Sequence, residues 1–93
     1  MNPAILDGRI KYGSRVLQIG GVDYVAERIN VLLDSHPMYG NAELQFVNAR
    51  PYRGDRLSTE IEGKEIAFQI EGVELIERMD YYNLIRCTFK EML

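Results

Sequence analysis

The feature that most constrains the fold is a hairpin pattern between Arg53 and Glu77. Apolar or β-branched residues alternate with polar ones on both sides of Gly63. The positions of one face are Leu57, Thr59 and Ile61 before the glycine and Ile66, Phe68 and Ile70 after it. A two-residue turn at Gly63 and Lys64 sets Leu57 opposite Ile70 and keeps every apolar position on that face. Because a slip of one residue would destroy this agreement, the pattern predicts a β-hairpin with one buried face.

Further strand patterns flank this hairpin. Short β-like runs occupy residues 10–12 and 15–19, and alternating runs occupy 42–46 and 81–90. The expected inward positions of the later runs are Ala42, Leu44, Phe46, Ile85, Cys87 and Phe89. Tyr39-Gly40-Asn41 has turn residues and is predicted to lie in a loop. At Gly72 the inward phase changes from even to odd numbers, to Val73 and Leu75, which indicates a β-bulge or a bend.

Residues 22–34 fit two different structures. In a helix, the residues of one apolar stripe would be Val22, Val25, Ala26, Ile29, Leu32 and Leu33. In a strand, Gly20-Gly21 would form a tight hairpin turn and Asp23 to Val31 would be the return strand. The local spacing by itself favours the helix.

The strand patterns together predict a mainly β fold in a single domain over residues 1–93. The expected architecture is a small antiparallel β-barrel or a two-layer sandwich of six or seven strands. A helix at 22–34 would make the fold α+β instead. The length allows one modest core without disulfides or metals.

No residue pattern indicates catalysis or metal binding. His36 precedes Pro37 in a predicted loop, and no cysteine or second histidine stands at ligand spacing from it. Cys87 falls on an apolar strand face, which favours a buried, unreactive thiol. Catalytic carboxylates need a pocket that shifts the pKa of one of them, whereas the glutamates here alternate along strands and are expected to face solvent. The sequence therefore predicts a non-enzymatic protein with no catalytic residues, no cofactor, no metal ligands and no small-molecule substrate.

Charge and composition narrow the classes of partner. A formal net charge of −3 weighs against binding nucleic acid by neutralising its phosphates. The chain has no apolar run of membrane-spanning length, and its first residues lack the pattern of a signal peptide. A single cysteine suits a reducing compartment. We therefore expect a cytoplasmic protein that binds neither membranes nor specific nucleic-acid sequences.

Opposite charges gather in the central hairpin and in the connection near it. The residues in question are Arg50, Arg53 and Arg56 in the preceding connection and Glu60, Glu62 and Glu65 in the hairpin itself. Arginine is favoured at interfaces because its planar fork pairs with carboxylates. In a ring every subunit presents both surfaces, so a basic surface of one copy can meet an acidic surface of the next. These residues are the predicted interface of a homo-oligomer; the alternative is a solvated loop.

Several segments resemble small virion proteins of tailed phages and prophages. Gly20 to Val31 is similar to a strand-turn-strand segment in such proteins, and Gly40 to Phe46 is similar to a glycine-led strand. Tyr52 to Leu57 and Glu62 to Ile70 resemble head–tail joining (stopper-like) proteins, in which a Gly-Asp pair opens a strand, a tight glycine turn follows and an aromatic strand comes next. Asn83 to Lys90 looks like their closing strand.

The resemblance implies a small β-barrel that assembles into a ring or tube with other virion proteins, without catalysis. It would place a phage-encoded chain in the virion, as a head–tail connector or tail subunit, and it favours a strand over a helix at Asp23 to Val31. The sequence departs from the pattern at Phe68, where a tyrosine is usual, and residues 32–38 have no counterpart. The alternative function is a small β-barrel adaptor module that binds other proteins.

Overall fold

The computed structural model describes residues 9–12, 14–46, 50–78 and 80–93. These residues form strands and turns with no helix among them, as the predicted mainly β class requires. The strands are β1 (Arg9–Tyr12), β2 (Arg15–Ile19), β3 (Val22–Leu32), β4 (Tyr39–Phe46), β5 (Arg56–Ile61), β6 (Lys64–Arg78) and β7 (Asn83–Glu91). The closing strand thus begins at Asn83, two residues later than the sequence pattern indicates.

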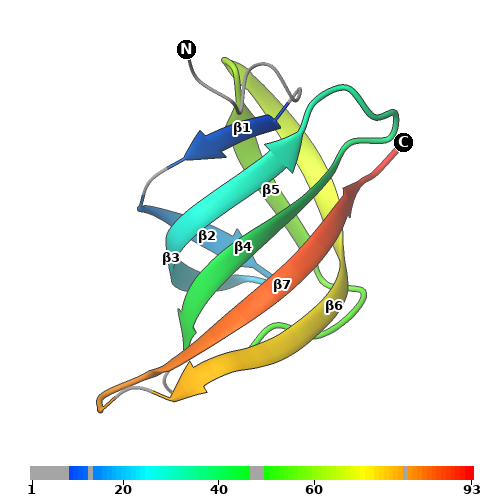
Figure 1. The fold of residues 1–93 in the computed structure, drawn as a ribbon. Coiled ribbons are helices and arrows are strands. Elements are labelled where there is room, and N and C mark those ends of the chain that lie inside the picture. The colour runs from blue at the N-terminus through cyan, green and yellow to red at the C-terminus, as the bar shows by residue number, and fades with distance from the viewer. Residues whose placement is uncertain (1–8, 13, 47–49, 79) are drawn as a thin grey trace.

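Six of these strands close into an antiparallel barrel (Figure 1). Their order is β3-β2-β5-β6-β7-β4, and β4 pairs with β3 to complete the circle. β3 is long enough to pair with β2 through its first half and with β1 through its second half. The architecture is therefore the predicted barrel rather than the sandwich.

The barrel interior is filled by the side chains that the alternation assigns to it. Buried side chains come from every strand of the barrel and include Leu17, Ile19, Leu44, Leu57, Ile61, Phe68, Ile70, Ile85, Cys87 and Phe89. The rings of Phe68 and Phe89 meet edge to face, with centroids 4.8 Å apart. Ile66 is only partly buried, and the side chain of Phe46 lies outside the described residues. Burial of large apolar side chains supplies most of the stabilisation of such a barrel.

Residues 22–32 form the strand β3, so the extended alternative for Tyr24 to Val31 is correct. The turn before it uses Gly20 and Gly21, both with positive φ, and Ile19 pairs with Val22. A register shift between Ala26 and Arg28 moves the inward positions from even to odd numbers. The apolar residues on either side of the shift are thereby three apart, which explains why the sequence looks helical at this point.

The central hairpin has the predicted faces but a different register. Its turn residues are Glu62 and Gly63, with φ of 49° and 82°, rather than Gly63 and Lys64. Leu57 consequently lies opposite Phe68 and not opposite Ile70. A turn with two positive φ angles matches the twist of the strands that it joins. Because the register differs by two residues, every side chain keeps its face, and the hydrophobic pattern cannot distinguish the two arrangements.

Gly40 lies inside a strand, so the predicted turn at residues 39–41 is wrong. Gly40 pairs with Val31 on one side and with Phe89 on the other. A Cβ atom at this position would lie 2.6 Å from the carbonyl oxygen of Asn30 and 2.6 Å from Cε2 of Phe89. A glycine is needed here because the Phe89 ring packs directly against the backbone of β4.

The predicted irregularity at Gly72 is confirmed as a register shift between Ile70 and Gly72. Val73 packs against the core after the shift, as expected. Leu75 does not: 51% of its surface is exposed, because β6 continues past the barrel, where β7 is its one partner among the described strands. A second shift lies between Leu75 and Glu77.

The closure between β2 and β5 is short. Its register contains one residue pair, Ile19 and Leu57, beside a hydrogen bond from the amide of Gly20 to the carbonyl of Arg56. Farther along, the Nη1 atom of Arg15 donates to Oγ1 of Thr59 and to the carbonyl of Glu60, each at 3.0 Å. A side chain therefore bridges the strands where they diverge.

Candidate assembly surface

One side of the barrel is a continuous sheet with two edges. β1, β3, β4, β7 and the second half of β6 pair in that order, and we call this layer the front sheet. In Figure 1 it faces the viewer, with β1 at the top and β6 at the bottom. Among the described residues β1 pairs only with β3. Within that part of the chain the front sheet ends at β1 on one side and at β6 on the other.

At the lower edge of the front sheet β6 extends beyond its described partner, because β5 is shorter than β6. β5 pairs with residues 64–69 of β6, and the 54–55 turn then exchanges two backbone hydrogen bonds with Ile70, each 2.8 Å long. From 71 to 78 no described residue pairs with β6 on the side away from β7. An open edge presents unpaired amides and carbonyls to which another strand can bind.

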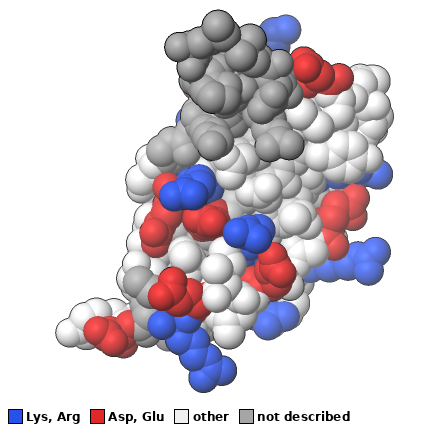
Figure 2. Space-filling model, in the orientation of Figure 1, with Lys and Arg blue, Asp and Glu red and all other residues white. Residues whose placement is uncertain are grey.

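Charges of alternating sign cross the outer face of the front sheet. Arg28, Glu43, Arg86 and Glu74 stand opposite one another on β3, β4, β7 and β6, and we call this set the ion row. The successive ion pairs measure 3.7, 3.4 and 3.3 Å, and Figure 2 shows the alternation on this face. A further ion pair on these strands joins Nζ of Lys90 to Oε1 of Glu71 at 3.8 Å. Surface ion pairs contribute about 0–1 kcal/mol each to stability.

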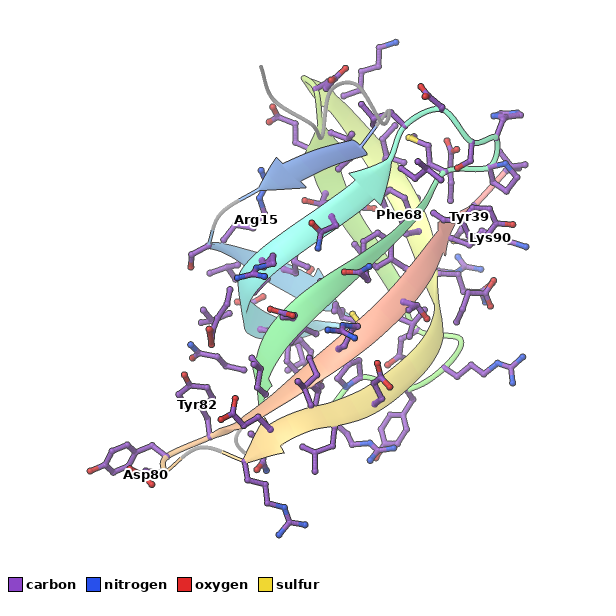
Figure 3. The ribbon with its side chains drawn as sticks, viewed as in Figure 1. Arg15, Tyr39, Phe68, Asp80, Tyr82 and Lys90 are labelled. Carbon is purple, nitrogen blue, oxygen red and sulfur yellow. The ribbon has the colours of Figure 1, made fainter. Side chains whose placement is uncertain are left out.

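The end of the β6–β7 hairpin extends beyond the barrel and exposes apolar side chains. We call residues 74–78 and 80–83 the arm. On it Leu75 is 51% exposed, Ile76 38% and Tyr81 89%. Figure 3 shows Asp80 and Tyr82 at its far end, away from Phe68 in the barrel interior. The hydroxyl of Tyr82 donates to Oε2 of Glu27 at 3.3 Å, and desolvation followed by the charge of Glu27 raises the pKa of that hydroxyl. Exposed apolar residues next to an open edge are typical of a contact surface.

A shallow hollow lies beneath the arm. It has a volume of about 430 Å³, and its lining residues are Arg50, Val73, Glu74, Leu75, Arg78, Asn83 and Ile85. Its lining combines the apolar residues Val73, Leu75 and Ile85 with the basic residues Arg50 and Arg78.

The residues predicted as an interface are all exposed, but the structure separates them by charge. Arg50, Arg53 and Arg56 lie before and at the start of β5, whereas Glu60, Glu62 and Glu65 surround the turn at its other end. The guanidinium of Arg50 stands over the ring of Tyr52 at 5.7 Å. Within one chain the arginine group and the glutamate group lie at opposite ends of β5, so a contact between the two groups would join two copies.

The sequence analysis missed the part of β6 that extends beyond β5, with its exposed Leu75 and Ile76. The sequence signal for it was the greater length of the β6 strand pattern compared with the β5 pattern.

The remaining candidate groups have separate environments. His36 is exposed in the turn before β4, as predicted. Among the described residues no group of three or more histidine, cysteine or acidic side chains could hold a metal ion. None of these residues belongs to a helix with the length and hydropathy for crossing a membrane. Cys87 is a buried free thiol, and burial raises its pKa from 9.0 to about 12.

The raised pKa of Cys87 predicts protection from alkylation in the folded protein. At pH 9 an unfolded chain would ionise about half of its thiol, whereas the folded chain holds it almost fully protonated and out of reach of the reagent. We expect iodoacetamide to modify native protein at least about a hundredfold more slowly than protein unfolded in urea. The contribution of the buried, protonated thiol to the free energy of unfolding is fully present below pH 9. This contribution falls as the pH rises from 9 toward about 12. Equal alkylation rates in the two states would show that the thiol is accessible.

In comparisons with known proteins, no family model, no curated protein and no solved structure matches the chain.

Proposed function

We propose that this chain is a non-enzymatic structural subunit that assembles through its β-edges and loops. The observation that carries the proposal is the edge of β6 at residues 71–78, with which no described residue pairs on the side away from β7 and where Leu75 and Ile76 are exposed. Such an edge has unpaired backbone groups and apolar side chains together, so pairing with another strand satisfies both at once. The bulge and the carboxylates of this segment oppose indiscriminate pairing and select a partner of complementary charge.

Its place of action is a tailed phage or prophage particle, as a head–tail connector or tail subunit in contact with other virion proteins. This part of the proposal is supported by the resemblance of the strand-turn-strand, Gly-Asp and closing-strand segments to small virion proteins. A barrel with exposed edges and a protruding arm suits a ring or tube, in which each subunit contacts two neighbours.

The basic cluster supplies the first test. We expect the double variant Arg53→Glu/Arg56→Glu to weaken self-association, because each change replaces an attraction to carboxylates of the next copy with a repulsion. The domain should stay folded, since both side chains are exposed. Lys64→Glu, a charge reversal at the acidic end of the same hairpin, is the control and should not weaken association. Sedimentation velocity at low and high salt measures the effect, which salt should reduce for an exposed contact.

Two results would contradict this account in different ways. Unchanged association of the double variant would remove the arginine cluster from the interface. A chain that is monomeric at every concentration, alone and with the products of its neighbouring genes, would contradict the structural-subunit proposal itself.

A second candidate is a monomeric adaptor that binds one protein partner. The hollow beneath the arm favours it, because a lining that combines apolar residues with Arg50 and Arg78 suits an acidic and apolar segment of a partner. A stable monomer that captures such a segment at this hollow would favour the adaptor over the subunit.

A further inference from the structure

A register shift places two glutamates on the outer face of β6 beyond the barrel. Glu74 lies opposite Arg86 and Glu77 lies opposite Leu84, and both of these partners alternate with buried residues of β7. The two glutamates are three positions apart because the register shifts between Leu75 and Glu77. In a regular strand Glu77 would share the inner face with Leu75. The shift therefore makes the outer face of this segment acidic.

The inner face of the same segment is apolar. Val73 packs against the core, and Leu75 lies opposite the buried Ile85 while 51% of its own surface is exposed. Both side chains line the hollow beneath the arm. This part of β6 thus has carboxylates on one face and apolar side chains on the other.

The strand that already pairs with β6 shows which side chains the carboxylates attract. Arg86 of β7 forms an ion pair with Glu74 at 3.3 Å, and Lys90 of β7 forms one with Glu71 at 3.8 Å. The side chain of Glu74 is nevertheless 64% exposed, and Glu77 forms no ion pair with a described residue. On the side of β6 away from β7, these carboxylates are available to further cations.

We propose that residues 71–78 of β6 bind an extended segment of another protein in which basic side chains alternate with apolar ones. The backbone of that segment pairs with β6 and continues the front sheet. Its basic side chains lie beside Glu74 and Glu77 on the outer face. Its apolar side chains lie beside Val73 and Leu75 on the inner face. This inference rests on the proposed structural function and names the chemistry of the partner that the β6 edge takes.

Charge disfavours the other kinds of strand. A second β6 edge, or any acidic strand, would set carboxylates against Glu74 and Glu77, and like charges directly opposite each other destabilise a strand pair. A strand that is basic on both faces is disfavoured as well. Arg78 lies opposite Asn83 and lines the hollow, so it would repel basic side chains on the inner face. Only an alternating segment meets both faces with complementary side chains.

A synthetic peptide tests this recognition directly. The probe is a blocked peptide of alternating lysine and valine, about eight residues long, which is within the usual length of a strand. We expect it to bind with a Kd of about 1 mM or below and to shift the amide NMR signals of residues 71–78.

Two further peptides separate strand pairing from simple attraction of cations. The first has the same composition with the lysines and valines in two blocks, so it cannot present one basic and one apolar face. The second keeps the alternation but has a methyl group on every backbone amide, so it cannot donate hydrogen bonds to β6. Each should bind at least about tenfold more weakly than the alternating peptide.

Charge reversal tests the role of the two glutamates. Glu74→Lys/Glu77→Lys should weaken binding of the lysine peptide at least about tenfold and should instead favour a peptide of alternating glutamate and valine. The control Asp23→Lys/Asp34→Lys makes the same change in net charge at exposed positions outside β6, and it should bind the lysine peptide nearly as well as the unchanged protein. Circular dichroism of each variant confirms the fold.

Preference for the alternating lysine peptide, lost in Glu74→Lys/Glu77→Lys and kept in the control, is the expected result. Equal binding of the block or methylated peptide, equal loss in the control variant, or NMR shifts that omit residues 71–78 would overturn the inference. If no peptide binds but the chain assembles with itself or with products of neighbouring genes, the inference fails while the structural function stands. If the peptide binds as expected but the chain is monomeric in every mixture, the inference stands and the structural function fails in favour of the adaptor.

Discussion

Replacing Phe68 with alanine is expected to leave the domain marginal or largely unfolded. The side chain is fully buried in the barrel, and its ring packs edge to face on Phe89 with centroids 4.8 Å apart. Truncating a buried phenylalanine costs about 3–5 kcal/mol, against a total stability of about 5–15 kcal/mol for a domain of ordinary size. Urea unfolding followed by circular dichroism measures the loss.

Gln69→Ala is the matched control for this prediction. Gln69 is the next residue on the same strand and points to the opposite, exposed face. Its side chain makes one long contact, 3.4 Å from Nε2 to the carbonyl of Gly54, so its truncation should be nearly neutral. Equal shifts of the urea midpoint for the two variants would mean that the faces of β6 are assigned wrongly.

Gly40→Ala is expected to be the second most damaging substitution. The added methyl group would lie 2.6 Å from a backbone oxygen and 2.6 Å from an aromatic carbon, both distances well inside van der Waals contact. Since a β4 backbone held by two neighbouring strands cannot move away easily, we expect a loss of about 1–3 kcal/mol or more. The free energy of unfolding from urea titration gives the value.

Gly72→Ala provides the comparison for Gly40. A Cβ at Gly72 would meet only Oγ1 of Thr88, at 3.2 Å, and that hydroxyl can shift by a small rotation. We therefore expect Gly72→Ala to cost well under half as much. A Gly40→Ala variant as stable as Gly72→Ala would refute the close packing of Phe89 on β4.

The faces of the strands could be predicted from the sequence, but their partners could not. Alternation places Leu57, Phe68 and Cys87 inside because the period of a strand is two residues. The same period makes a two-residue slip invisible, which is why the hairpin register had to come from the positive φ of Glu62 and Gly63. The residues around Gly40 are typical of a turn. Its place in a strand is explained by the close approach of Phe89, which is distant in the sequence.

The candidate surface was predictable only in part, because the local pattern shows which side chains are exposed but not which strands pair. Exposure of the charged residues follows from local pattern, and the arginine and glutamate clusters are exposed as expected. Whether a strand edge is open depends instead on which strands close the barrel and how long each one is. Among the described residues β6 lacks a second partner after Gln69 because the pairing with β5 ends there while β6 runs on to Arg78, a difference that appears only when the lengths of the two strand patterns are compared.

Amide hydrogen exchange in dilute and in assembled protein tests assembly through the β6 edge most directly. Amides that point outward from an unpaired edge exchange rapidly, and pairing with another strand slows them. We predict that assembly increases protection in residues 71–78, with little change in the buried strands. Assembly that leaves residues 71–78 as exchangeable as in the dilute protein would contradict the account.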